Sequence, residues 1–491
     1  MEYIRQIHPK DNVGVALQTI PKGTKISEGV IAQEEIPAGH KIALFSIRKN
    51  ESIVKYGYPI GIATTEIPVG AWVHLHNIET RLGELLEYTY KPDFQEVKPQ
   101  NPKHFLGYRR KNGKVGIRNE VWIIPTVGCV NGVAKRIEEE SQKFLTESLD
   151  GIYSYCHPLG CGQAAGDLKY LQRALAGMAD NPNAGAVLFL ALGCEHNQRA
   201  EMEAALGDYD HDRIKFLVAQ ECEDEIAAGV DAVRELCEYA SKFHREECPA
   251  SDLVVGLKCG GSDGLSGITA NPLVGAFTDL LISQGGTAIL TEVPEMFGAE
   301  TILMNRCRDK EVFNKTVDMI NGFKKYFQRY QEPIYLNPSP GNKAGGITTL
   351  EDKSLGCIQK GGSAPVSDVI YYGEQVRKKG LNLLKGPGYD LVSSAAEAFS
   401  GAQMVLFTTG RGTPFGCPVP TIKISSNTAL AQKKARWIDF DAGRLLDGYS
   451  MPELLEEFYD FILDVASGKR KAKSEFLDKR DLAIFKDGVI L

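Results

Sequence analysis

From Leu106 onward, short apolar runs alternate with segments whose apolar residues recur every three or four positions. Runs such as 121–125 and 253–257 have the length of buried strands, and segments such as 310–330 have the length and period of helices. This alternation predicts βαβ units and mostly parallel sheets. Because 491 residues are too many for one hydrophobic core, the chain must divide into several domains.

The N-terminal segment has a different character. The pattern Ile-Pro-x-Gly occurs at 20–23, 36–39 and 67–70, and strand-like runs lie between these copies. Pro followed by Gly two residues later suits tight turns, so we predict a small all-β domain here. The expected organisation is this all-β domain (1–77), a linker (78–105), an α/β domain (106–248) and a C-terminal α/β domain (249–491).

The overall charge and the apolar content exclude several classes of protein. A net charge of −7 gives no basic surface of the kind that binds nucleic acid. The chain has no run of 18 apolar residues, so no membrane span is expected, and its N-terminus lacks a signal-peptide core. Eleven cysteines, an odd number, indicate reduced thiols and not a disulfide framework. We therefore expect a cytoplasmic protein.

Three loops rich in glycine and polar residues lie near predicted strand ends, at 259–272, 337–343 and 408–414. Glycine lets backbone N–H groups approach a ligand, and the polar side chains direct hydrogen bonds. Lys343 and Arg411 add cations that can hold a carboxylate, unless they are ordinary exposed loop residues. The candidate ligand-binding residues are Gly260, Gly261, Ser262, Asp263, Thr269, Asn271, Asn342 and Thr413.

Four cysteines beside glycine follow predicted strands: Cys129, Cys161, Cys194 and Cys259. In one parallel sheet they would share the rim where ligands bind, and three thiolates there would suit an iron–sulfur cluster. The alternative is that each is a small buried residue in a tight corner.

Two histidines and two glutamates are further candidates for metal or acid–base chemistry. His74 and His76 lie two residues apart on a predicted strand, so both imidazoles face one side and can bind a divalent metal. The alternative is a solvated strand face. Glu292 and Glu295 follow a buried run. They can serve as an acid–base pair or as metal ligands, and the alternative is that they cap the following segment.

The motifs at 259–263, 337–343 and 409–414 resemble the altronate and galactarate dehydratase family. The segments 39–41, 55–57 and 73–77 look like its amino-terminal SAF-type β-clip domain. Within the family, 118–129 and 292–300 are similar to the altronate branch, and the resemblance covers essentially the whole chain.

This resemblance implies a hydro-lyase that removes water from a sugar acid. For the altronate branch, D-altronate would become 2-dehydro-3-deoxy-D-gluconate in hexuronate (galacturonate) catabolism. The resemblance also implies activation by Fe²⁺ or Mn²⁺, and we expect a homo-oligomer (dimer). The alternatives are a galactarate dehydratase, a sulfolactate-type lyase and a non-catalytic sugar-acid-binding protein.

The expected chemistry assigns roles to the candidate residues. A divalent metal would stabilise the enediolate, and Arg411 or Lys343 would hold the substrate carboxylate. His40 is the favoured base, with Lys55 and Tyr56 beside it in a site closed against the α/β domain. The favoured metal ligands are His74 and His76, followed by Cys161, Cys194 and Cys259.

Overall fold

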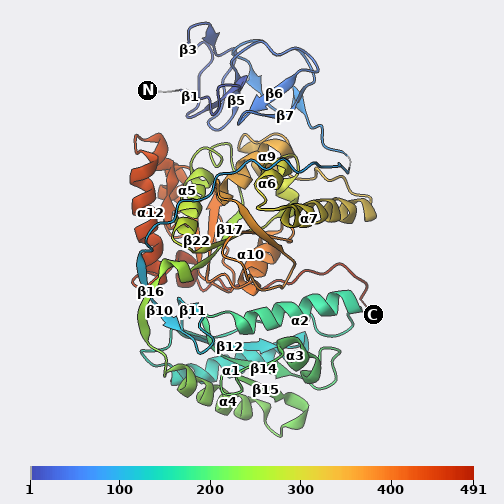
Figure 1. Cartoon of the computed structure of the whole chain (residues 1–491), viewed down its shortest axis with the longest axis vertical. Coiled ribbons are helices and arrows are strands. Elements are labelled where there is room, and N and C mark those ends of the chain that lie inside the picture. Colours follow the sequence, from blue (N-terminus) through green and yellow to red (C-terminus); the bar gives the residue numbers. More distant parts are fainter. Residues whose placement is uncertain (1–2, 84, 491) are drawn as a thin grey trace.

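The computed structural model describes residues 3–83 and 85–490. Figure 1 shows three bodies stacked along the long axis of the molecule, with the C-terminal α/β domain in the middle. The strand-rich N-terminal domain lies at one end and the second domain at the other. The predicted fold class, a small all-β domain followed by α/β domains with parallel sheets, is confirmed.

The N-terminal domain is built from short antiparallel strands. One sheet has the order β1 (Ile4–Arg5), β2 (Val13–Ala16), β5 (Lys41–Ala43) and β8 (Trp72–Val73). The others contain β6 (Ser52–Lys55), β7 (Tyr58–Ala63) and β9 (Ile78–Glu79), and the pair β3 (Lys25–Ser27) and β4 (Val30–Ile31).

Two copies of the Ile-Pro-x-Gly repeat pair with each other, and the third pairs with another segment of this domain. Ile20 forms a bridge with Ile36, and Ile67 forms a bridge with Ile47. All four isoleucines are buried, so each copy of the repeat contributes one core residue beside its turn.

The expected strand through His74 and His76 is wrong. Strand β8 ends at Val73, and the side-chain oxygen of Asn77 accepts a hydrogen bond from the backbone N–H of His74 at 2.9 Å. The two histidines therefore lie in a turn closed by an asparagine, which a period-two pattern cannot reveal.

The second domain carries a four-stranded parallel sheet. Its order is β13 (Gly151–Ser154), β12 (Glu120–Pro125), β14 (Ala184–Ala191) and β15 (Ile214–Val218). Its helices are α1 (Asn131–Ser141), α2 (Ala165–Asp180), α3 (Arg199–Leu206) and α4 (Glu225–Ala240). A small antiparallel sheet of β11 (Val115–Gly116), β10 (His104–Arg109) and β16 (Arg245–Pro249) joins this domain to the next.

The C-terminal domain has a seven-stranded parallel sheet. Its order is β19 (Val366–Ile370), β20 (Gly380–Leu384), β18 (Thr287–Leu290), β17 (Val254–Cys259), β21 (Met404–Thr409), β22 (Thr421–Ser425) and β23 (Phe440–Asp441). Its helices are α5 (Ala270–Ser283), α6 (Glu300–Asn305), α7 (Lys310–Arg329), α8 (Pro340–Ala344), α9 (Leu350–Cys357), α10 (Asp390–Phe399), α11 (Thr428–Lys433), α12 (Met451–Ala466) and α13 (Lys473–Phe476).

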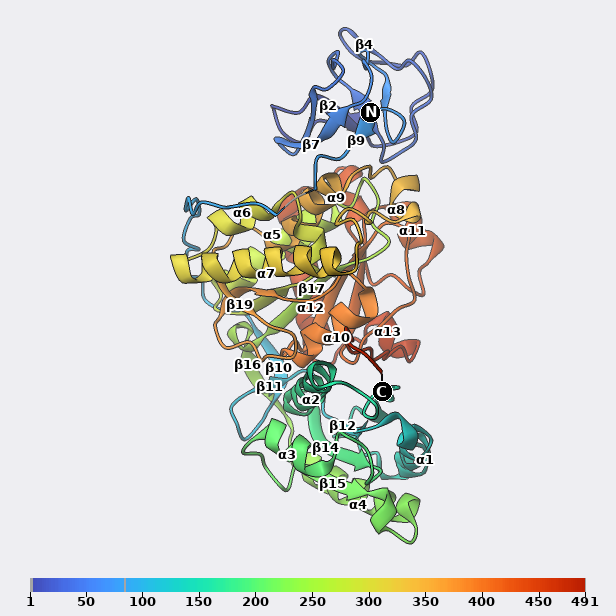
Figure 2. The ribbon, with the colours of Figure 1, turned by 90° about the vertical axis from the view of Figure 1, so that its right-hand side faces the viewer.

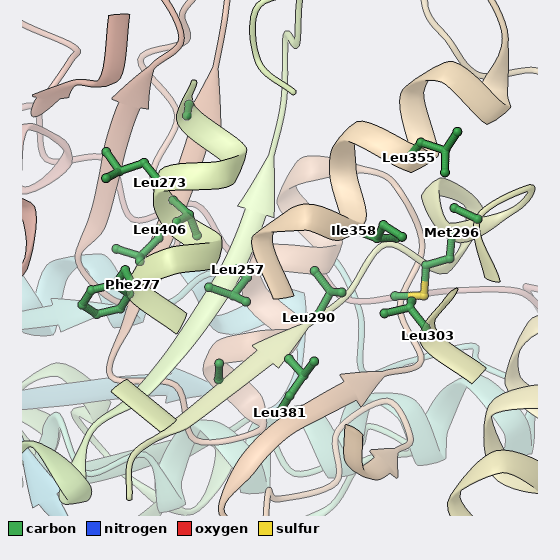
Figure 3. Close-up of a cluster of buried hydrophobic side chains, with 14 of the residues drawn as sticks. Leu257, Leu273, Phe277, Leu290, Met296, Leu303, Leu355, Ile358, Leu381 and Leu406 are labelled. Atoms are coloured by element: carbon green, nitrogen blue, oxygen red, sulfur yellow. The ribbon is translucent and has the colours of Figure 1, made fainter. Parts of the chain in front are cut away.

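Apolar side chains on both faces of this sheet form its core. Figure 3 shows one face, where Leu257, Leu290 and Leu381 of neighbouring strands pack with Phe277 of α5 and Ile358 after α9. The cluster of the other face includes Ile289, Val405 and Phe399 of α10. A sheet covered by helices on both faces explains why its strands are continuous apolar runs. None of the helices in the described residues combines the length and apolar character needed to cross a bilayer.

Candidate active site

The candidate site lies at the carboxyl edge of the seven-stranded sheet. Lys258 and Cys259 end β17, and Glu292 and Glu295 follow β18. Cys357 ends α9, which faces the N-terminal domain in both views (Figures 1 and 2). Parallel strands deliver the polar residues that follow them to one edge of a sheet, which is where α/β proteins hold ligands.

Two thiols and one carboxylate form a compact buried group. The Sγ atoms of Cys259 and Cys357 are 3.3 Å apart, and Glu295 Oε2 lies 3.4 Å and 3.1 Å from them, respectively. All three residues are buried, and their ligand atoms lie within 4.8 Å of one another. Within residues 3–83 and 85–490, no other set of three His, Cys, Asp or Glu residues is gathered this closely.

Three buried lysines balance the charge of this group. Lys353 Nζ lies 2.8 Å from Glu295 Oε1, and Lys258 bonds to Glu292 as well as to Asp390. Lys360 Nζ is 3.8 Å from Glu292 Oε2. Buried charges are tolerated only when they are paired, so the cluster holds its carboxylates in fixed positions.

The electrostatics of the group favour an anionic thiol. The hydrogen bond from Cys357 and the charge of Lys360 outweigh burial and lower the pKa of Cys259 to about 6. Burial alone would raise the pKa of Glu295, but Lys353 and the neighbouring lysines bring it down to about 2. A thiolate and a carboxylate are therefore available near neutral pH, as metal coordination requires.

The N-terminal domain reaches this edge through a buried ion triad. Asp352 Oδ2 is 2.8 Å from Lys41 Nζ, and its Oδ1 is 3.0 Å from Lys55 Nζ. Burial alone would lower the pKa of Lys55, but Asp352 and Tyr56 outweigh it, so this pKa lies above its usual value. Lys55 is therefore a fixed cation supplied by one domain and oriented by the other.

Glycines let the backbones of the two domains touch. A Cβ added to Gly264 would lie 1.8 Å from the carbonyl oxygen of Gly39, and one added to Gly346 would lie 2.3 Å from the same oxygen. A Cβ at Gly267 would lie 1.9 Å from the hydroxyl oxygen of Tyr56. Only glycine allows these approaches, which bring Tyr56 over the carboxyl edge of the sheet.

A narrow cavity of about 10 Å³ between the two domains connects these groups, so the domains must part to admit a ligand larger than a water molecule. Lys55 and Tyr56 line it from one side, and Ser262, Lys353 and Cys357 line it from the other. The hydroxyl of Ser262 is buried and makes no hydrogen bond within the part of the chain that the structure describes. It is therefore available to a ligand.

Most of the predicted loop residues bond to protein in this structure. Asp263 accepts hydrogen bonds from Ser266 and Ser426, and Thr269 donates to the carbonyl of Ser426 at 2.7 Å. Asn271 donates to the carbonyl of Gly356, so it ties α5 to α9.

The remaining predicted residues of the loops lie around this framework. Asn342 donates to the carbonyl of Ser262, and Thr413 accepts from the N–H of Phe415 within its own turn. Gly260 is buried beside Asp390, and Gly261 has a φ of +61°.

Lys343 lies in the short helix α8, and Arg411 lies in the loop after β21. Arg411 is exposed, and a Cβ added to Gly341 would lie 3.8 Å from its Nε. Lys343 is half-buried next to Asn342. Neither residue lines the narrow cavity, so their carboxylate-binding role stays a prediction.

The three candidate histidines gather around Trp72 in the N-terminal domain. His40 Nδ1 accepts from the indole N–H of Trp72 at 3.2 Å, and its Nε2 lies 3.3 Å from the carbonyl oxygen of Ala344. The rings of His40 and His74 are 4.8 Å apart, and Trp72 stacks on His74. Burial and neighbouring cations lower the pKa of His74 to about 4, whereas His76 is exposed. The metal-binding role of His74 and His76 and the catalytic role of His40 stay predictions.

The four strand-end cysteines do not share one rim, contrary to expectation. Cys129, Cys161 and Cys194 follow strands of the second domain and are exposed, whereas Cys259 ends β17 in the other sheet. Cys161 Sγ lies 3.8 Å from His196 Nδ1. Alternation of strands and helices does not reveal which strands share a sheet.

Sequence reasoning missed Cys357, Asp352 and the three buried lysines. Cys357 follows a glycine, as the strand-end cysteines do, but it ends a helix, so a search along strand ends passes over it. Lys258 precedes Cys259 at the end of an apolar run, and a lysine within a buried strand was an available signal.

Comparisons with known proteins agree along the whole chain. Residues 250–490 match the model of the "D-galactarate/Altronate dehydratase, C-terminal" family. Residues 107–241 match "D-galactarate dehydratase/Altronate hydrolase, second domain", and residues 1–81 match "Altronate/galactarate dehydratase SAF domain".

Three curated relatives span nearly the full length. Altronate dehydratase of Escherichia coli is 52% identical over 497 residues, and altronate dehydratase of Bacillus subtilis is 51% identical over 501 residues. Both alignments cover 100% of each chain. Galactarate dehydratase (L-threo-forming) of Escherichia coli is 34% identical, covering 96% of this chain and 94% of its own.

Proposed function

Since this chain belongs to the altronate/galactarate dehydratase family, we propose that it is a hydro-lyase that converts D-altronate to 2-dehydro-3-deoxy-D-gluconate. Identity of 52% and 51% to two altronate dehydratases, against 34% to a galactarate dehydratase, supports altronate as the substrate. The observation that carries the proposal is the buried group of Cys259, Glu295 and Cys357 beneath the cavity that the N-terminal domain closes. The cytoplasmic location and the homo-oligomeric state stay predictions.

The donor set fits a divalent transition metal. Cys259, Glu295 and Cys357 are buried and close together, and thiolate ligands favour Fe²⁺ over Mn²⁺. When bound, the ion supplies a Lewis acid that stabilises negative charge on the substrate oxygens. Lys258, Lys353 and Lys360 hold the carboxylates in place.

Residues of the N-terminal domain supply charge and a proton at the cavity. The ammonium group of Lys55 offsets the negative charge that develops when the C2 proton leaves. Burial raises the pKa of Tyr56, so its phenol stays protonated and can donate to the departing C3 hydroxyl. The free hydroxyl of Ser262 binds a substrate hydroxyl from the other side.

His40 is the predicted acceptor of the C2 proton, and burial lowers its pKa, which keeps the imidazole neutral. Both ring nitrogens of His40 face protein partners, Trp72 and the carbonyl of Ala344. A carbonyl only accepts, so Nε2 donates to Ala344 and Nδ1 holds the lone pair. His40 must therefore release Trp72 to take the C2 proton. Near-normal turnover by a folded His40→Ala variant would remove it from the mechanism.

An anaerobic assay of keto-acid formation tests the proposal. The purified chain is incubated with D-altronate, galactarate or sulfolactate, first with Fe²⁺ and then with a chelator. We expect turnover of altronate that needs iron and exceeds turnover of the other acids. Absence of turnover by the iron-loaded protein, together with saturable altronate binding, would instead identify a non-catalytic binding protein.

A further inference from the structure

A second cavity lies far from the candidate active site. It has a volume of about 420 Å³ and lies between the second and the C-terminal domain, beside α2. Figures 1 and 2 show α2 at the end of the C-terminal domain opposite α9. A cavity of this size accommodates a ligand of about the size of a hexose derivative.

Basic side chains dominate the lining of this cavity. They are Arg110, Lys111, Arg173, Arg213 and Arg377, and they outnumber the three aspartates. Two of these aspartates already have partners, since Asp180 pairs with Lys114 and Asp210 pairs with Lys111. Among residues 3–83 and 85–490, no ion pair joins Arg110, Arg173, Arg213 or Arg377 to a carboxylate.

The guanidinium groups of Arg110 and Arg213 lie near each other on one wall of this cavity. Arg110 donates to the carbonyls of Pro182 and Arg118 and to Asn119, so its donors bond to protein. Burial and then the charge of Arg213 lower the pKa of Arg110 to about 9. Within residues 3–83 and 85–490, no ion pair joins either guanidinium to a carboxylate. An anion bound beside the two guanidinium groups would offset the repulsion between their positive charges.

Arg213 also retains an unused donor. Its NH2 group donates to the carbonyl of Ala184 at 2.8 Å, whereas its buried Nε has no hydrogen-bond partner among the described residues. A buried donor without a partner is costly, and natural proteins satisfy nearly all of them. The Nε itself is enclosed by protein, so an oxyanion in the cavity would pair with the charge of this guanidinium group through its Nη atoms.

We propose that this interdomain cavity binds a small polyhydroxylated oxyanion, a sugar phosphate or a sugar acid, at a site separate from the catalytic one. Arg213 and the exposed Arg377 hold the oxyanion from opposite domains, and the aspartate at the rim, Asp208, accepts from ligand hydroxyls. Ile214 and Tyr209 border the carbon skeleton. Because the ligand contacts both domains, its binding stabilises their junction.

Calorimetric titration of the iron-loaded, full-length protein tests this site with two probes, glucose 6-phosphate and gluconate. We expect saturable binding of at least one probe, and affinity about tenfold or more weaker in Arg213→Gln and in Arg377→Ala. Arg234→Ala, which removes an exposed arginine of α4, serves as the matched control and should bind like wild type. Tighter binding of the first probe identifies a phosphate site, and tighter binding of the second a carboxylate site.

Activity on altronate without either probe should be unchanged in all three variants, which separates this site from the proposed function. The proposal is overturned if neither probe binds saturably, or if Arg213→Gln and Arg377→Ala bind both probes as tightly as wild type.

Discussion

Replacing Asp352 by asparagine should loosen the N-terminal domain from the rest of the protein. Asp352 neutralises Lys41 and Lys55, whose side chains are only 0% and 2% exposed. Asparagine keeps the volume but leaves both ammonium groups without a counter-charge. Removing one partner of a buried ion pair costs about 3–5 kcal/mol. In a domain of 150–250 residues, this lowers Tm by roughly 6–20 °C.

The pH dependence of this effect follows from the same contacts. Burial alone would raise the pKa of Asp352, but Lys41 and Lys55 outweigh it and hold that pKa well below its usual range. The stabilisation is therefore present above the unfolded pKa, near pH 4, and is lost as pH falls further. The difference in Tm between wild type and Asp352→Asn should be full at pH 7 and should shrink below about pH 4.

Thermal unfolding of both proteins measures this difference. Asp460→Asn is the matched control because Asp460 pairs with Lys103 at 2.7 Å in an exposed position, where a pair contributes less than about 1 kcal/mol. Equal and small losses of Tm in the two variants would refute the idea that the triad fastens the domains. Asp352→Asn should also lower kcat/KM, because Lys55 loses the group that orients it.

Three further results are expected. Cys357→Ser should lower bound iron tenfold or more by elemental analysis, whereas Cys194→Ser in the other domain should retain it; equal iron in both would exclude the thiol group as the metal site. Burial raises the pKa of Glu397 to about 8, so wild type loses stability as pH rises from about 4.5 to 8. The Tm of Glu397→Gln relative to wild type should therefore increase over that range, and a Tm difference that does not change with pH would contradict this. Gly267→Ala places a Cβ 1.9 Å from the phenolic oxygen of Tyr56 and should reduce turnover without loss of iron. Gly132→Ala adds its Cβ in open space and should leave turnover unchanged, so equal turnover in the two variants would contradict this prediction.

The architecture was predictable because hydrophobic periodicity is a local property. The segment 310–330 was expected to be a helix, and α7 spans Lys310–Arg329. Strand β17 and the loop after it were also expected. The division of strands between two sheets was not, because strand pairing depends on contacts between distant residues. This is why Cys129, Cys161 and Cys194 were expected beside Cys259.

The candidate site was predictable only in part, for a related reason. Polar residues after β17 and β18 follow buried runs, so Cys259 and Glu295 could be found from the sequence. Asp352 and Cys357 belong to a short helix without a strong apolar stripe. The partners of Asp352 lie 297 and 311 residues away, and those of Cys357 lie 62 and 98 residues away. Burial of Lys41 and Lys353 has the same origin, since lysine is normally exposed.

The glycine contacts between Gly39, Gly264 and Gly346 have a consequence for assembly. The domains contact each other through main-chain atoms and the buried carboxylate of Asp352. The tether at 85–103 is itself held by the C-terminal domain, where Tyr88 donates to Glu300 and Tyr90 donates to the carbonyl of Cys307. A polypeptide cut within that tether should still reassemble from its two pieces, with turnover that rises with the concentration of the smaller piece. The tether in this enzyme therefore sets the effective concentration of a component that is already shaped to bind.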